Sequence, residues 1–378
     1  MTPRLRGQAF PWPAPCQPRI VMPSSPTRAL LRHSSSVSSS PPKKRIFVRV
    51  AVVTATAGAI GAYIRWQQDS KNSTLNPFSF TEYELVSREP ISSTSSLFTL
   101  RPVKPGQNRE VYETAWRTGV WSVMFKQPQL QIGRDYTPLP PIEQVSGALE
   151  NTSGGDQEPL RFLIRRDPHG EVSRYLHGLN LGTTVEMRGP QIECEIPPDV
   201  KDILFIAGGT GIAPALQAAY TLLRRDNGSA DSRIHILWAS RKREDCLGGS
   251  NDSHPNTTEE PWWRKLFRST PATAPEDPSK GLIVKELETL KSQFPGQVTV
   301  DYFVDEERSM IDKQSISRFT KSRDGRTHGG KLILVSGPDG FISYMAGPKL
   351  WAEGRELQGP LQGIIKELDL KEWNVWKL

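Results

Sequence analysis

Apolar positions follow two different patterns along the main part of the chain. Over residues 81–198 they form short runs rich in Val, Ile, Phe and Tyr, separated by turn residues: YELVSRE, SSLFTLRPV, VWSVMFKQPQLQIG, LRFLIRRD and TTVEMRGPQIECEI. Short β-rich runs at this spacing predict a small antiparallel β-barrel. Over residues 199–378 apolar strands alternate with helical stretches, which predicts a parallel sheet with helices on both faces. We therefore expect a β domain followed by an α/β domain.

The second domain alternates between strands and helices, with one interruption. The strands are predicted at DILFIAG, RIHILWAS, QVTVDYFV and KLILVSGP, and the helices at about 213–224, 283–293 and from Asp339 onward. Residues 245–280 break the alternation and are rich in Ser, Pro, Asn and Thr. This composition is typical of loops, so we expect a surface insertion there.

The N-terminal region has a different character. Residues 1–45 contain Arg, Ser and Pro but no acid, which is the composition of a mitochondrial presequence. The apolar run 46–64 would span about 28 Å as a helix, enough to cross a bilayer. We expect a transmembrane helix over 46–66 and a linker over 67–80; the alternative is an apolar part of the targeting sequence. Because basic residues precede the span, the C-terminal body is expected in the intermembrane space of the mitochondrion, anchored to the inner membrane.

The charge of the chain is concentrated in that region. Lys and Arg number 48 against 41 Asp and Glu, for a formal net charge of +7. Ten of the basic residues and none of the acids lie in 1–68, so the remainder carries about −3. A nucleic-acid-binding surface is therefore not expected, since it needs Lys and Arg clustered on a folded domain.

The three cysteines are Cys16, Cys194 and Cys246, and they form no CxxC motif and no zinc-ligand spacing. This excludes a disulfide scaffold, and no metal site is expected. We expect unpaired thiols; a Cys194–Cys246 disulfide is the alternative in an oxidising compartment.

Two motifs in the first domain carry groups that suit a flavin nucleotide. In RDYTP, residues 134–138, a guanidinium can pair with a diphosphate, a ring can pack on a flavin and a hydroxyl can reach a ring nitrogen. The alternative is an ordinary strand edge. In GEVS, residues 170–173, Gly170 permits a close turn, and a helix starting near Val172 would aim its NH groups and the Ser173 hydroxyl at a phosphate. The alternative there is a plain helix cap.

Two motifs in the second domain follow directly after predicted strands. GGTGIAP, residues 208–214, stands between the strand ILFIA and a helix, where glycines let a backbone approach a pyrophosphate. SGPDGF, residues 336–341, follows the strand KLILV. Loops at the carboxyl ends of parallel strands are where ligands bind in such sheets, so both loops are candidate nucleotide contacts.

The order and spacing of the four motifs resemble the ferredoxin reductase superfamily, and within it the NADH-cytochrome b5 reductase type, over about residues 81–378. The resemblance implies an FAD-binding barrel followed by an NAD(P)H-binding α/β domain. The residues that it implies for FAD are Arg134, Asp135, Tyr136, Thr137, Pro138, Arg165, Gly170, Glu171, Val172 and Ser173. Those that it implies for NAD(P)H are Gly208, Gly209, Thr210, Gly211, Pro214, Ser240, Arg241, Gly337, Pro338, Asp339 and Gly340.

Thr137 and Ser336 are the residues that the resemblance places beside the reacting atoms, near flavin N5 and the nicotinamide. Relatives often carry a Cys where this chain has Ser336, so a step that depends on a thiol is not expected. Where relatives often carry a Lys and a Tyr, the chain has Arg165 and Asp167; the Arg keeps the charge, but the Asp cannot stack on adenine.

The choice between NADH and NADPH stays open at this point. No acid stands at the end of RIHILWAS to hold a ribose 2′-hydroxyl. Instead Ser240 is followed by Arg241, Lys242 and Arg243, which can receive a 2′-phosphate or form a solvated basic turn. The expected coenzyme is therefore NAD(P)H.

The stretch KQPQLQIGRDYTPLPP, together with the presequence and single span, also resembles fungal mitochondrial FAD proteins of cytochrome c haem attachment. That resemblance implies an enzyme that takes a hydride from NAD(P)H and passes electrons to a haem acceptor, with cytochrome c haem lyase as a partner. Two alternatives remain: a reductase of cytochrome b5 or a quinone, and a non-catalytic FAD-binding scaffold for the haem lyase.

Overall fold

The computed structural model describes residues 54–56, 58, 60–61, 73–104, 108–141, 158–224, 231–253, 280–321, 329–352 and 354–378. The chain divides into two units, Met1–Ile60 and Gly61–Leu378, and all the elements below lie in the second. The predicted presequence 1–45 lies outside the described residues, as does most of the predicted membrane helix 46–66. Among the residues that are described, none of the helices has the length and apolar character needed to cross a membrane.

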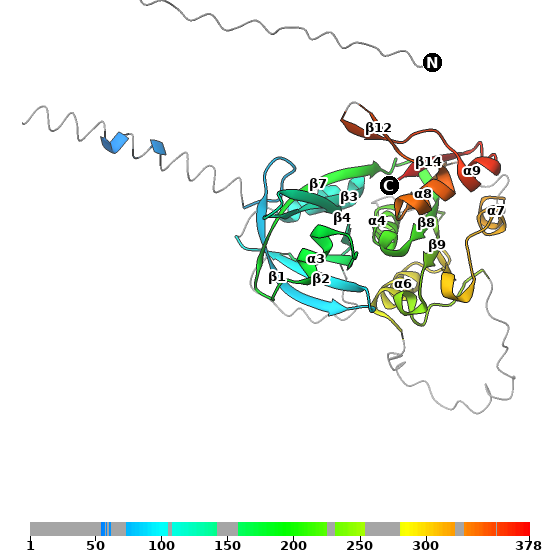
Figure 1. Cartoon of the computed structure of the whole chain (residues 1–378). Coiled ribbons are helices and arrows are strands. Elements are labelled where there is room, and N and C mark those ends of the chain that lie inside the picture. The colour runs from blue at the N-terminus through cyan, green and yellow to red at the C-terminus, as the bar shows by residue number, and fades with distance from the viewer. Residues whose placement is uncertain are drawn as a thin grey trace, which may run out of the picture. The chain divides into compact units, whose positions relative to one another are not determined.

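The first part of this unit is a seven-stranded antiparallel sheet, which confirms the predicted β domain (Figure 1). Its order is β4-β3-β7-β1-β2-β6-β5. The strands are β1 (Thr81–Pro90), β2 (Ser95–Pro102), β3 (Gly119–Gln127), β4 (Ile132–Tyr136), β5 (Pro138–Leu139), β6 (Leu160–Arg165) and β7 (Thr184–Glu195). The two edge strands, β4 and β5, are separated in sequence by Thr137 alone, so the sheet has to curl until its edges meet. The RDYTP motif is therefore the seam of a barrel.

Two helices complete this domain, α2 (Asn108–Thr118) and α3 (Glu171–His177). Helix α2 is not predicted by the sequence analysis. It buries Tyr112, Ala115 and Trp116, which are three and four residues apart and so share one helix face, against the barrel core. The Tyr112 and Tyr83 hydroxyls are 2.6 Å apart in that core, so one donates a hydrogen bond to the other.

The second part is a five-stranded parallel sheet of order β10-β9-β8-β11-β14, as predicted. Its strands are β8 (Val200–Gly208), β9 (Arg233–Ser240), β10 (Val298–Val304), β11 (Gly330–Ser336) and β14 (Trp373–Lys377). Successive residues of β8 enter different cores: Ile203 and Phe205 join one cluster, and Leu204 and Ile206 the other. The apolar run ILFIA of β8 is thus buried on both faces.

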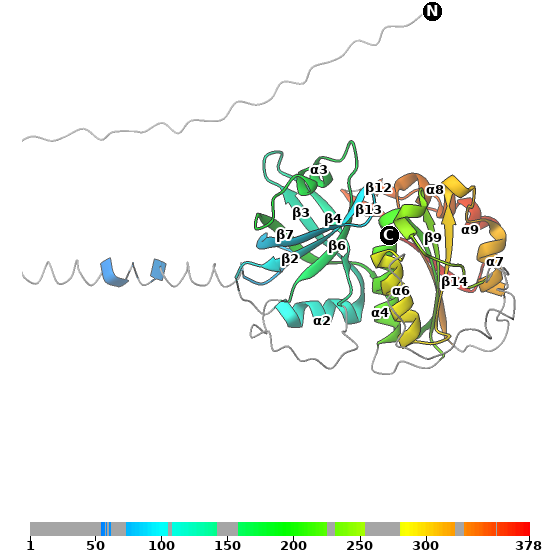
Figure 2. The same cartoon turned by 90° about the horizontal axis from the view of Figure 1, so that it is seen from below.

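Helices cover the two faces separately, as Figure 2 shows. One face carries α4 (Ile212–Leu223) and α6 (Leu282–Gln293), and the other α7 (Lys313–Lys321), α8 (Asp339–Ala346) and α9 (Gly363–Glu367). Three short 3₁₀ turns, η1 (Gly209–Gly211), η2 (Arg243–Cys246) and η3 (Asp305–Glu307), follow β8, β9 and β10. A small hairpin of β12 (Leu350–Ala352) and β13 (Arg355–Leu357) precedes α9.

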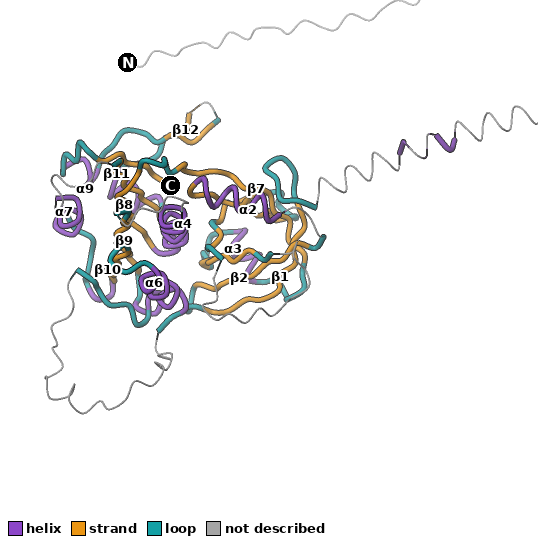
Figure 3. The backbone as a smooth tube through the Cα atoms, turned by 180° about the vertical axis from the view of Figure 1, so that it is seen from behind, coloured by secondary structure: helices purple, strands orange, loops and turns teal. Residues whose placement is uncertain are grey.

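Helix α4 lies between the barrel and the parallel sheet (Figure 3). The cluster that contains its apolar residues also contains Leu97 and Leu139 of the barrel, so the two domains share a core. An ion pair between Arg161 of β6 and Glu286 of α6, 2.6 Å long and largely shielded from solvent, adds a polar contact. The barrel and the α/β domain are therefore joined by packing as well as by the chain.

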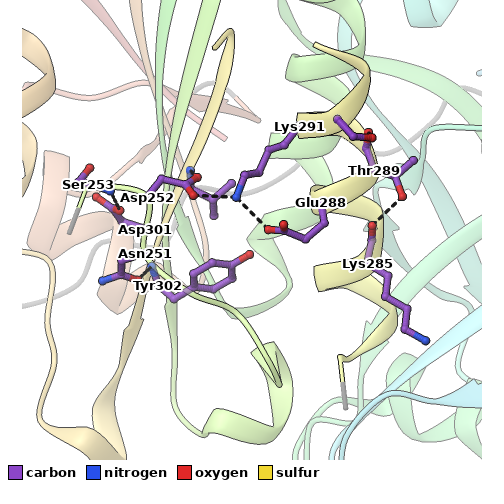
Figure 4. Close-up of polar contacts among 11 residues, drawn as sticks. Asn251, Asp252, Ser253, Lys285, Glu288, Thr289, Lys291, Asp301 and Tyr302 are labelled. Carbon is purple, nitrogen blue, oxygen red and sulfur yellow. Dashed lines mark hydrogen bonds and ion pairs between the residues drawn. The ribbon is translucent and has the colours of Figure 1, made fainter. Parts of the chain in front are cut away.

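The beginning of the predicted surface insertion is part of the sheet edge (Figure 4). Asn251 Oδ1 accepts a hydrogen bond from Tyr302 N, and Asp252 Oδ2 accepts one from Val300 N, both at 2.8 Å. These NH groups belong to β10, which is the edge strand of the sheet among the described residues. Residues 251 and 252 of the predicted insertion thus supply acceptors to the edge strand. The surface insertion over 245–280 stays a prediction, since residues 254–279 lie outside the described part.

The expectation of unpaired thiols is confirmed for two cysteines. Cys194 and Cys246 are buried and free, and Cys16 lies outside the described residues.

Candidate functional site

The two glycine turns of the α/β domain meet at the centre of the sheet. They follow β8 and β11, which are neighbours although nonconsecutive, so this is the point where the strand order reverses. A Cβ atom at Gly211 would lie 2.5 Å from the Ser336 carbonyl oxygen, and one at Gly208 would lie 2.9 Å from the Phe341 ring. The turns are thus packed so closely that these positions exclude a side chain. Gly209, with φ +58°, adopts a left-handed conformation between them.

A cleft of about 480 Å³ opens beside these turns. Six of the predicted NAD(P)H residues line it: Gly208, Gly209, Ser240, Arg241, Pro338 and Gly340. The other predicted ones, Thr210, Gly211, Pro214, Gly337 and Asp339, are absent from its lining. The lining residues that the sequence analysis missed are Ala239, Asp305, Met310, Ile311, Phe341, Tyr344 and Met345. Of these, Asp305 could have been predicted from the sequence, because it directly follows β10 and so lies at the carboxyl end of a strand.

Three predicted contacts, Arg165, Ser240 and Ser336, differ from the other candidate residues in their domain or in their exposure to solvent. Arg165, predicted for FAD, stands at the end of β6 and lines this cleft of the α/β domain. Ser240 is 3% exposed and its hydroxyl is shielded from solvent, whereas Arg241 is exposed. Ser336, the last residue of β11, is 8% exposed and pairs with Ala207 in the sheet.

The RDYTP motif runs along β4, through the seam and into β5. Arg134 is exposed, and its guanidinium donates to the carbonyl oxygen of Gly133 at 2.9 Å. The Tyr136 ring stands edge-on to Phe125 with centroids 5.2 Å apart, and burial raises the pKa of its hydroxyl to about 12. Burial also raises the pKa of Asp135. The motif thus presents an exposed cation beside a partly buried ring that packs against the barrel core.

The predicted GEVS turn precedes α3, which contacts β4, so the two candidate FAD motifs are neighbours. The Ser173 hydroxyl accepts a hydrogen bond from Asp167 N and donates one to Gly170 O, both at 3.1 Å. A Cβ atom at Gly170 would lie 2.7 Å from that hydroxyl. Ser173 therefore holds the turn closed, and its contact with a phosphate stays a prediction, as do those of Glu171 and Val172.

Gln217 of α4 joins the two halves of the site and was missed by the sequence analysis. Its side chain is fully buried; Oε1 accepts a hydrogen bond from Trp121 N and Nε2 donates one to Pro138 O, each at 2.8 Å. Helix α4 begins at the GGTGIAP turn, so one helix connects that turn to the barrel seam. A lone amide within the apolar helix sequence IAPALQAAYTLL was the signal for it.

No protein-family model matches the chain. It is 28% identical over 221 residues to the cytochrome c mitochondrial import factor CYC2 of Saccharomyces cerevisiae, covering 48% of this chain and 60% of that protein. It is 30% identical over 188 residues to an uncharacterized FAD-binding protein of Schizosaccharomyces pombe, covering 49% and 59%. It is 25% identical over 252 residues to NADH-cytochrome b5 reductase 2 of Meyerozyma guilliermondii, covering 65% and 67%. These relatives, at 25–30% identity, include an NADH-cytochrome b5 reductase.

The matches to CYC2 and to the Schizosaccharomyces pombe protein span about 60% of the length of those two homologues. Among solved structures, the chain is similar to the cytochrome b5 reductase domain of Ulva prolifera nitrate reductase, with 21% identity and a TM-score of 0.47. That match covers 71% of this chain and 91% of the domain. The resemblance of the sequence to the reductases is confirmed by the homologues themselves.

Proposed function

We propose that the protein is an NAD(P)H-dependent FAD oxidoreductase of the cytochrome b5 reductase type. The observation that carries this proposal is the cleft at the strand-order reversal, where two tightly packed glycine turns of the α/β domain face Arg165 of the barrel. Glycine turns at this point of a parallel sheet are the usual place for a nucleotide diphosphate. The homology to NADH-cytochrome b5 reductases supports the same conclusion.

The barrel residues fit FAD. Arg134 is exposed on β4, where a guanidinium can pair with two phosphate oxygens. The turn at Gly170 lies beside the same strand, and Tyr136 offers a fixed ring next to the seam at Thr137. One of the homologues is named as an FAD-binding protein, which supports this assignment.

FAD, when bound, supplies an acceptor for a hydride from NAD(P)H and a donor of single electrons. The chain's residues bind and orient. Gly208, Gly209 and Gly340 leave room for the coenzyme to approach, and Thr137 at the seam and Ser336 at the end of β11 are the residues proposed beside the reacting atoms. Close approach and alignment are what such a transfer needs, so neither hydroxyl is required as a general base.

The electron acceptor that we propose is a haem, in the maturation of mitochondrial cytochrome c. The name of the homologue CYC2, a cytochrome c mitochondrial import factor, supports this choice. In this proposal residues 1–45 direct the chain to mitochondria and 46–66 anchor it in the inner membrane, with the body in the intermembrane space next to cytochrome c haem lyase. Cytochrome b5 is the second candidate acceptor, because several homologues are named as its reductases; a quinone is a further candidate.

The test uses the purified full chain. It is expected to show the visible absorbance of bound flavin and to lose it anaerobically when NAD(P)H is added. A protein that retains no flavin after FAD is added would refute the reductase proposal. A protein that binds flavin, but whose flavin NAD(P)H does not bleach, would favour the scaffold for the haem lyase. Comparing anaerobic reduction of haem and of cytochrome b5 by the same preparation decides between the two acceptors.

The Arg134→Ala variant tests the FAD site itself. Loss of a charged hydrogen-bond partner costs about 1.5–3 kcal/mol, so FAD should bind about ten- to a hundredfold more weakly. The matched control is Arg101→Ala, a partly exposed arginine that pairs with Glu84 at 3.2 Å on the barrel surface. Equal flavin retention in both variants contradicts the role of Arg134.

A further inference from the structure

A second cavity lies between helices α4 and α6, apart from the coenzyme cleft. Its volume is about 320 Å³, and none of the residues that line it lines the cleft beside the glycine turns. Pockets for small molecules usually measure about 300–1,000 Å³, so this one is large enough for a small ligand. We call it the α4–α6 groove, and the proposed function assigns nothing to it.

The α4–α6 groove is elongated, because its lining follows both helices. It runs from Leu216 to Arg224 along α4 and from Leu282 to Gln293 along α6. At a rise of about 1.5 Å per residue, these stretches are about 12 Å and about 16 Å long. The ends of the two helices meet where Arg224 Nη2 donates a hydrogen bond to Gln293 Oε1 at 3.3 Å. The groove therefore suits an extended ligand better than a compact one.

The walls of the α4–α6 groove are largely apolar. Leu216 is 4% exposed and belongs to the core that the two domains share, and Leu290 packs against that core. Leu282 is 37% exposed, although it is a large apolar residue. Pro140 and Pro141, which follow the barrel seam, add two more apolar surfaces. An alkyl chain in the groove would remove apolar surface from water, which is favourable.

The groove also contains a cation whose charge is not compensated. Lys285 of α6 is partly exposed, and no carboxylate in the described part of the chain pairs with its ammonium. The neighbouring Glu286 is engaged by Arg161 at 2.6 Å. Figure 4 shows the Lys285 side chain pointing away from Glu288 and Lys291, which pair with each other at 2.9 Å. A ligand with an anionic group would therefore meet an available positive charge in the groove.

Arg224 is a second cation in the groove, so the two have to be compared. The Arg224 guanidinium lies 4.9 Å from the centre of the Tyr220 ring and is bonded to Gln293. It is therefore already held by the protein, whereas the Lys285 ammonium is not. An extended apolar groove with an uncompensated cation is complementary to a chain-like anion. We propose that the α4–α6 groove binds a straight-chain carboxylate, with the carboxylate at Lys285 and the alkyl chain along the leucines.

The experiment compares ligands that differ in charge or in chain length. Calorimetric titration of the purified full chain with decanoate, decyltrimethylammonium and acetate is expected to show saturable binding of decanoate alone. Lys285→Gln should weaken decanoate binding about tenfold or more, because a charged hydrogen bond is lost. Leu282→Ala should weaken it too, because apolar contact is lost. The matched control is Lys321→Gln, an exposed lysine of α7 on the other face of the sheet, which should leave binding unchanged.

The absence of decanoate binding to the wild type would overturn the inference and leave the groove to another occupant, such as residues 142–157, which follow Pro141 in the sequence. Equal binding of decanoate and decyltrimethylammonium would also overturn it, as would decanoate binding that survives both Lys285→Gln and Leu282→Ala. An unchanged urea midpoint of Lys285→Gln shows that weaker binding is not a loss of fold. Bleaching of the flavin by NAD(P)H tests the proposed function separately, because the groove and the coenzyme cleft share no lining residue.

Discussion

Replacing Gln217 by Leu removes two buried hydrogen bonds between the barrel and the α/β domain while nearly conserving side-chain size. Gln217 is fully buried and bonds Trp121 N and Pro138 O, each at 2.8 Å. The pairing of β3 with β7 is irregular between Val120 and Trp121, so that the amide supplies the acceptor which the ladder does not. Leu supplies neither a donor nor an acceptor.

The expected loss of stability follows from the two groups left unpaired. An orphaned buried donor or acceptor costs about 1–3 kcal/mol, which makes about 2–6 kcal/mol for the Trp121 NH and the Pro138 carbonyl together. Burying the leucine methyl groups offsets part of this, since each buried carbon contributes about 0.8 kcal/mol. Two such carbons offset about 1.6 kcal/mol, so the net destabilisation of Gln217→Leu should be about 0.4–4.4 kcal/mol, with a midpoint near 2.4 kcal/mol.

Urea unfolding followed by tryptophan fluorescence measures this loss. The matched control is Gln314→Leu on the exposed face of α7, which should change stability by less than about 0.5 kcal/mol. Because Pro138 belongs to the seam of the barrel, Gln217→Leu should also lower flavin occupancy. A variant that unfolds at the wild-type urea concentration refutes the reasoning that this amide holds the domains together.

Two further substitutions test other parts of the structure. Gly211→Ala should lower the free energy of unfolding by about 1–3 kcal/mol, because its Cβ atom would lie 2.5 Å from the Ser336 oxygen. Thermal unfolding measures this, with Gly340→Ala as the control, since nothing lies within 4 Å of a Cβ atom there. Equal melting temperatures of the two variants argue against tight packing of the turns. Asp301 is buried, which raises its pKa, but hydrogen bonds from His235 and Ser253 outweigh burial and lower the pKa to about 2. The stability that these bonds supply is present above pH about 4 and lost as the pH falls toward 2, about 2 kcal/mol in all. In Asp301→Asn the urea midpoint should therefore fall less than in the wild type between pH 5 and pH 2. An equal fall in both proteins contradicts this assignment.

Much of the fold was predictable because its signals are local. The segment RIHILWAS coincides with β9, and the helix predicted near 213–224 is α4 at Ile212–Leu223. Helix α2 was missed because the stretch between the second and third barrel strands carries only three buried apolar positions among polar and charged ones. The way the barrel closes was not predictable either, because local sequence does not show that β4 pairs with β3 and β5 with β6.

The positions of the glycine turns in the candidate site were predictable, because these turns follow strands. Which side chains line the cleft was less predictable. Gly208, Gly209 and Gly340 line the cleft, because the position of a strand's carboxyl end follows from the element order; their contact with the coenzyme stays a prediction. Arg165 faces that cleft from the other domain, and no local pattern indicates which domain a strand end will face.

By itself, the sequence determined the type and order of the elements and the place of the glycine turns, because periodicity and turn chemistry depend on neighbouring residues. Which charges remain available was decided only by the tertiary structure. Lys242 and Arg243 are taken up by Glu244 and Glu307, while Arg241 is left facing the cleft. Three adjacent cations that read alike in the sequence thus differ in role, since ion pairing depends on distances that only folding sets.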